Sequence, residues 1–78
     1  MTRIAFIRWT DSALYAGPFD PNDINGPCSN VSAGLLVHEN KETVSIALDK
    51  CIDTGQVRSV LCIPRFAIQS IDYFQVMS

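Results

Sequence analysis

The sequence predicts an all-β domain of five strands, and three observations lead to that prediction. Four runs rich in Val, Ile, Leu or aromatic residues follow one another with short connections, at residues 31–38, 43–48, 57–63 and 67–74. A fifth run of this kind, residues 3–9, stands near the beginning of the chain. Proline, glycine, asparagine and aspartate gather between the runs, where turns are expected.

Length and composition indicate one globular domain spanning residues 1–78. Hydrophobic residues make up 47% of the chain and charged residues 18%, which excludes a disordered protein. No apolar run approaches the roughly 20 residues that cross a bilayer, and the N-terminal residues lack the pattern of a secretion signal. A cytoplasmic protein without membrane contact is therefore expected. The formal net charge of −2 disfavours nucleic acid as a partner.

The first strand and the segment after it differ sharply in composition. Residues 3–9 place apolar side chains on both faces, which predicts a central or doubly covered strand. Residues 10–30 contain so much Pro, Gly, Asn and Asp that we expect a long ordered loop, with one helical turn near residues 20–24 or at the later elbow. Loops of this length are more often functional than idle.

Short turns connect the remaining strands. Asn40 is placed to adopt a left-handed conformation in the first hairpin, and Gly55 supplies a positive φ in the second. Along residues 43–48, Val44, Ile46 and Leu48 share one face. Pro64 cannot donate to a strand ladder, so the fourth strand should end there and an elbow should redirect the chain.

This order of strands is that of the small SH3-like and Sm-like barrels, so we expect a closed five-stranded barrel with a long loop after its first strand. Closure would hide the strand edges that otherwise invite aggregation. A domain of 78 residues buries only roughly 60% of its unfolded surface, which leaves a marginal core. A homo-oligomer, most simply a dimer, is therefore predicted.

The residues that could perform catalysis or bind metal show no recognised spacing. Cys28, Cys51 and Cys62 are odd in number and far apart, which predicts reduced thiols, buried or half-buried. His38, the single histidine, is expected to be a surface hydrogen-bonding residue, and no spacing supports its pairing with a cysteine. An enzyme is therefore not predicted.

Cofactors and metals are not predicted either. The oxygen-rich segment around Asp20 and Asp23 contains Pro21 and lacks the terminal Glu of a calcium loop, so turn chemistry explains it better.

Four segments carry a resemblance to a group of short uncharacterised proteins of tailed phages and prophages. They are Ser32-Ala33-Gly34-Leu35-Leu36-Val37-His38-Glu39-Asn40, Val44-Ser45-Ile46-Ala47-Leu48, Leu61-Cys62-Ile63-Pro64-Arg65-Phe66-Ala67-Ile68, and Trp9-Thr10-Asp11-Ser12. The passage from Cys28 to Gly34 is longer here than in that group. The resemblance implies a phage accessory protein that binds a component of the host, including the nucleotide signals of bacterial immunity.

The candidate ligand site lies where the first strand leads into the long loop. The candidate residues are Trp9, Asp11, Ser12 and Tyr15. The aromatic side chains could stack on a base, while Ser12 and backbone N–H groups could receive a phosphate or ribose. Arg65, held in the elbow, is the first choice of counter-charge for an anion, ahead of Arg8 and Arg58.

Each of these residues also has a structural interpretation. Trp9 could cap the core, and Asp11 with Ser12 could form a local turn. Arg65 could be solvated or could pair with Asp11 or Asp72.

Two functions follow from this site. The first is sequestration of a nucleotide-derived signal, in a pocket that two subunits complete. The second is a protein-interaction module that uses the loop and exposed groups such as Leu14, Tyr15 and Phe19 against a host or virion protein. RNA binding of the Sm type conflicts with the negative charge.

Overall fold

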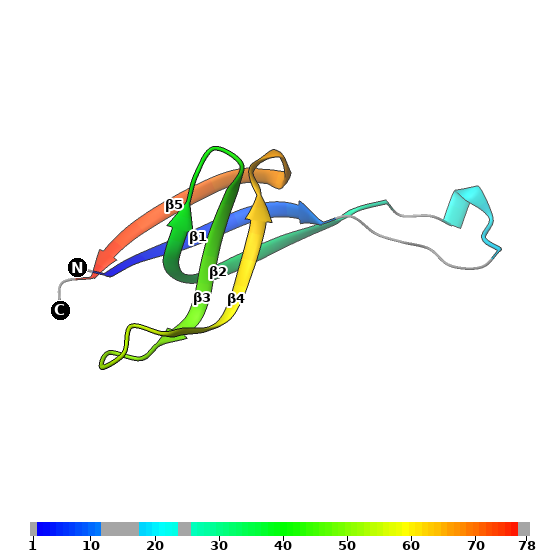
Figure 1. The fold of residues 1–78 in the computed structure, drawn as a ribbon. Helices are drawn as coiled ribbons and strands as arrows, with labels where there is room; N and C mark the ends of the chain where they lie inside the picture. Colours follow the sequence, from blue (N-terminus) through cyan, green and yellow to red (C-terminus); the bar gives the residue numbers. More distant parts are fainter. Residues whose placement is uncertain (1, 12–17, 24–25, 77–78) are drawn as a thin grey trace.

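The structure, a computed structural model, describes residues 2–11, 18–23 and 26–76, and it contains one antiparallel sheet of five strands (Figure 1). The strands are β1 (Thr2–Asp11), β2 (Cys28–Glu39), β3 (Thr43–Lys50), β4 (Val57–Pro64) and β5 (Ile68–Val76). Two short 3-10 turns are present, η1 (Pro21–Asp23) and η2 (Arg65–Ala67). The predicted all-β fold with five strands is confirmed, and both places named for a helical turn carry one.

The strands lie in the order β4-β3-β2-β1-β5, and the sheet is not closed. β5 runs along β1 from the pair Thr2 and Val76 to the pair Trp9 and Ile68, and no other described strand pairs with it. Among the strands that the structure describes, β4 pairs with β3 alone. The predicted succession of five strands along the chain is confirmed, whereas the predicted closure is wrong, because β4 and β5 form no ladder with each other.

The core lies on one face of the sheet. Its buried members come from β1, β3 and β4 and are Ala5, Ile7, Val44, Ile46 and Ile63. Trp9, Leu36, Ile68 and Ile71 pack against them. Residues 44–47 of β3 are all buried, so both faces of this strand are covered. Leu48 continues the face of Val44 and Ile46 but is 75% exposed, because it lies beyond the core.

Curvature arises at defined positions along the strands. The pairing of β2 with β3 shifts between Leu36 and His38, and that of β1 with β5 shifts between Arg8 and Trp9. Such irregularities bend a strand and increase its twist. At Gly34 of β2, an added Cβ would lie 2.8 Å from the carbonyl oxygen of Ala47. The two strands therefore approach more closely there than any larger residue permits.

The turns follow the predicted chemistry with one exception. Asn40 does not adopt a positive φ. Its side-chain Oδ1 instead accepts the backbone N–H groups of Glu42 and Thr43, each at 2.8 Å. This side-chain hydrogen bonding stabilises the turn, so Asn40 does not use the left-handed conformation that its residue type permits. Gly55 does have a positive φ, 78°, and β4 ends at Pro64 as expected.

The first and second strands extend beyond the core as a two-stranded arm. Asp11 pairs with Cys28 at the end of the ladder, so both strands reach into the segment expected to be loop. Figure 1 shows η1 far from the five-stranded sheet. The molecule measures 52 × 23 × 19 Å along its principal axes. The loop predicted for residues 10–30 is therefore shorter than expected, because residues 10–11 belong to β1 and residues 28–30 belong to β2.

Candidate functional site

Trp9 serves the core rather than an open surface. Its side chain is half-buried and packs against the core cluster, and the indole Nε1 donates a hydrogen bond of 3.0 Å to Ser32 Oγ on β2. The ring packs on the core and its N–H group has a partner, so these contacts agree with the interpretation that Trp9 caps the core.

The other predicted site residues lie in different parts of the molecule. Asp11 is exposed at the end of β1, in the arm, while Ser12 and Tyr15 lie outside the described residues. Arg65 begins η2, and its Nε donates to the carbonyl oxygen of Asn40 at 2.9 Å. Arg65 therefore faces the turn between β2 and β3, and it pairs with neither Asp11 nor Asp72.

A cluster of polar side chains that the sequence did not reveal surrounds Glu39. Tyr73 donates its hydroxyl to Glu39 Oε2 at 2.8 Å, and Arg65 Nη2 lies 3.5 Å from the same oxygen. Arg3 Nη1 lies 3.5 Å from Glu39 Oε1, and the Arg3 guanidinium carbon lies 4.6 Å from the centre of the Tyr73 ring. We call Arg3, Glu39, Arg65 and Tyr73 the Glu39 cluster.

The Glu39 cluster connects strands that are not neighbours in the sheet. Glu39 ends β2 and Tyr73 lies on β5, whereas β1 separates these two strands in the ladder. Burial raises the pKa of Tyr73, and the hydrogen bond to the Glu39 carboxylate raises it further. Two cations face one carboxylate here, so the arrangement is suited to holding the curved sheet together more than to acid–base chemistry.

Tyr73→Phe is expected to remove one hydrogen bond to a charged acceptor and to lower the free energy of unfolding by about 1 kcal/mol. The raised pKa of Tyr73 means that this tyrosine stabilises the fold fully below about pH 10, and that its contribution is lost as the pH rises through the raised value. Absorbance titration of the phenolate should therefore show a late step that Tyr73→Phe abolishes, leaving only Tyr15. An unchanged titration curve in the variant would contradict the assignment.

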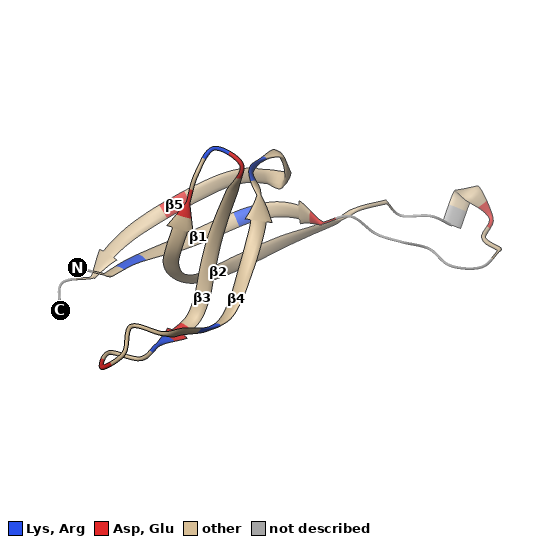
Figure 2. Cartoon of the chain, viewed as in Figure 1, with Lys and Arg blue, Asp and Glu red and all other residues tan. Residues whose placement is uncertain are grey.

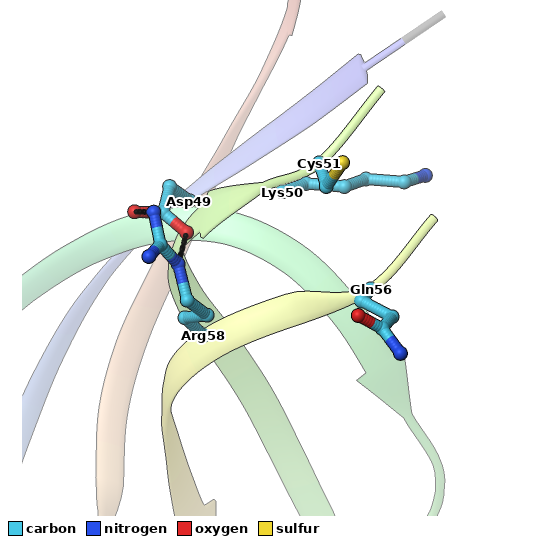
Figure 3. Close-up of a pocket in the computed structure, with 5 residues that line it drawn as sticks. All are labelled: Asp49, Lys50, Cys51, Gln56 and Arg58. Carbon is cyan, nitrogen blue, oxygen red and sulfur yellow. Dashed lines mark hydrogen bonds and ion pairs between the residues drawn. The ribbon is translucent and has the colours of Figure 1, made fainter. Parts of the chain in front are cut away.

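A pocket of about 470 Å³ lies at the base of the hairpin between β3 and β4, lined by Asp49, Lys50, Cys51, Gln56 and Arg58 (Figure 3). Arg58 donates from Nε and Nη2 to the two Asp49 carboxylate oxygens, at 2.9 and 3.0 Å. These hydrogen bonds raise the pKa of Arg58. Both side chains are exposed, and the Arg58 charge is neutralised by the Asp49 carboxylate. Arg58 is therefore not an unpaired cation in the wall of this pocket.

Cys51 stands at the start of the same hairpin loop, and hydrogen bonds from Thr54 and from backbone groups of Thr54 and Asp53 lower the pKa of its thiol. His38 is exposed and contacts Asn40 at 3.3 Å, at the opposite end of β3. His38 pairs with Ser45 on β3, six residues before Cys51, so roughly 20 Å of extended strand separates the cysteine from the histidine. The structure does not bring the two together as a nucleophile and base.

All three cysteines are free and exposed, which corrects the expectation of buried or half-buried thiols. Cys28 begins β2 in the arm, Cys51 lies in a hairpin loop, and Cys62 lies on the edge strand β4, so none reaches the core. Cys62 accepts a hydrogen bond of 3.1 Å from Ser45.

The oxygen-rich segment near η1 contains the expected turn contact, because Asp20 Oδ1 accepts the N–H group of Asn22 at 3.0 Å. Among the residues that the structure describes, no group of three or more His, Cys, Asp and Glu is arranged to hold a metal ion. The described part of the chain also has no helix long and apolar enough to cross a membrane.

Comparison of the chain with family models, with curated proteins and with solved structures finds no match.

Proposed function

We propose that this chain is a non-enzymatic protein-interaction module whose edge strand β4 accepts a strand from another polypeptide. The observation that carries the proposal is the unpaired edge, since β4 forms its ladder with β3 and no described strand pairs with its other side. An extended partner added to such an edge gains main-chain hydrogen bonds, while its side chains provide specificity.

Of the two edge strands, β4 has the composition that is better suited to accept an added strand. Residues 59–64 of β4 carry no charged side chain, and Val60 and Leu61 are 46% and 38% exposed. Charged residues are a common protection of sheet edges against unwanted pairing. β5 has Asp72 in its middle, whereas on β4 the one charged residue, Arg58, stands near the beginning and is paired with Asp49.

The same edge gives a route to the homo-oligomer that the sequence analysis predicts, because β4 of a second copy is an equivalent unpaired strand. A host or virion protein as partner, and the phage setting, stay predictions from the sequence resemblance. Sequestration of a nucleotide-derived signal has less support, since Trp9 Nε1 donates to Ser32, and Arg65 Nε and Nη2 donate to Asn40 and Glu39.

A charge placed on the β4 edge is the test of this function. Val60→Lys should abolish self-association measured by light scattering at tens of micromolar protein, and should abolish binding to any strand-donating partner. Ser70→Lys, an exposed position on β5, is the matched control and should leave association unchanged. Thermal unfolding of both variants establishes that the fold is retained.

Two outcomes would refute the proposal. One is association that Val60→Lys leaves intact. The other is a wild-type chain that stays monomeric and binds no protein, but gives heat on titration with cyclic dinucleotides or ADP-ribose derivatives. In the second case Arg65→Ala and Trp9→Phe should weaken binding, which would favour sequestration of a nucleotide signal.

A further inference from the structure

A second and larger groove is lined by residues at the beginning of β1, by residues 35–37 of β2 and by the hairpin that joins β3 to β4. Its volume is about 680 Å³. The lining residues are Thr2, Arg3, Leu35, Leu36, Val37, Lys50, Ile52, Gly55 and Val57. The volume falls within the range of roughly 300–1,000 Å³ that is typical of small-molecule sites.

Most side chains of this groove are aliphatic, and part of this surface is uncovered. Ile52 is 95% exposed at the hairpin, and Val37 is exposed at the irregularity of β2. Leu35, Leu36 and Val57 continue the apolar lining. An apolar ligand body would remove this surface from water, which is the general source of affinity in such sites.

The charges of the groove have one sign. Arg3 and Lys50 are its two charged lining residues, and no carboxylate lines it. Figure 2 shows basic residues both at the beginning of β1 and at the base of the hairpin. Arg3 is already shared with Glu39 at 3.5 Å, whereas Lys50 forms no ion pair with any described residue. Lys50 is therefore the cation that can accept an external anion.

We propose that this groove binds a single-chain amphiphile with a carboxylate head, of the class of medium-chain fatty acids. The carboxylate lies against Lys50, and the hydrocarbon chain lies over Leu36, Val37 and Ile52. Lys50 complements the single negative charge of such a ligand, and the aliphatic lining complements its unbranched apolar chain. None of residues 59–64 lines this groove, so the test of ligand binding is independent of the test of strand addition at β4.

Titration of the full chain with decanoate, and separately with decanol, tests the proposal, with binding followed by amide chemical shifts and calorimetry. Decanoate should shift the amides of residues around Leu36 and Ile52 and should bind more tightly than decanol. Lys50→Gln should weaken decanoate binding by roughly tenfold, the change that a loss of about 1.4 kcal/mol produces, and should leave decanol unaffected. Ile52→Ser should weaken both ligands.

Lys41→Gln is the matched control, because Lys41 is an exposed lysine in the turn between β2 and β3, at the other end of β3. It should bind decanoate as the unchanged chain does. The proposal is overturned if decanoate causes no shift near the groove, if decanol binds as tightly as decanoate, or if Lys50→Gln and Lys41→Gln have the same effect.

Discussion

Replacing Ile7 by alanine is expected to lower the free energy of unfolding by about 2–5 kcal/mol, the largest effect of any single substitution considered for this chain. Ile7 is 0% exposed on β1, a strand with neighbours on both sides, and it belongs to the core cluster with Val44 and Ile63. The truncated side chain leaves a cavity that the paired strands cannot close. Since whole domains are stable by about 5–15 kcal/mol, the variant should be close to unfolding at room temperature.

Equilibrium denaturation in urea measures this effect, with Ile52→Ala as the matched control. The control removes the same atoms from a side chain that is 95% exposed, so its stability should change by no more than about 0.5 kcal/mol. Similar losses in the two variants would contradict the position of the core. If Ile7→Ala does not fold, Ile7→Val, with an expected loss of about 0.5–1.5 kcal/mol, provides the same comparison.

Local patterns predicted the strands and several turns because these features depend on neighbouring residues. The runs of branched and aromatic residues predicted all five strands, Pro64 marked the end of β4, and Gly55 marked the hairpin turn. The elbow at η2 followed from the same proline. Each of these features is decided by the backbone preference of one residue or by an alternation of period two.

Features that depend on strand register could not be predicted in this way. The Glu39 cluster joins residues from the first, second and fifth strands, and nothing in their spacing brings them together. The same holds for the groove formed by Lys50, Ile52 and Leu36. The hydrogen bond that the Trp9 indole donates to Ser32 also depends on register, because Ser32 lies on the neighbouring strand.

Closure of the sheet and exposure of the cysteines are two further features that local sequence patterns could not predict. Whether β4 meets β5 depends on how far the sheet curves, which is set by the irregularities of pairing near Val37 and Trp9. The cysteines resemble buried residues by type, because free cysteine is among the most buried residues. Cys62 is nevertheless exposed, since β4 is an edge strand and the sheet stays open beside it.

Gly34→Ala is expected to lower the free energy of unfolding by about 1–3 kcal/mol, although intrinsic strand preference favours alanine over glycine by roughly 0.5–1 kcal/mol. The expected sign follows from the contacts of the added Cβ, 2.8 Å from the carbonyl oxygen of Ala47 and 3.3 Å from Cβ of Ile46. A backbone oxygen within a strand ladder cannot rotate away as a flexible side chain could. β2 and β3 must therefore move apart at this position.

Urea denaturation of Gly34→Ala and of Ala33→Ser, a change at the exposed neighbouring position, separates this contact from a general sensitivity of β2. Ala33→Ser should alter stability by no more than about 0.5 kcal/mol. Amide shifts of Gly34→Ala should change most at Ile46 and Ala47, because those residues supply the atoms in contact. A stabilised Gly34→Ala variant would mean that β2 and β3 are farther apart than described, and that intrinsic preference alone decides the residue at this position.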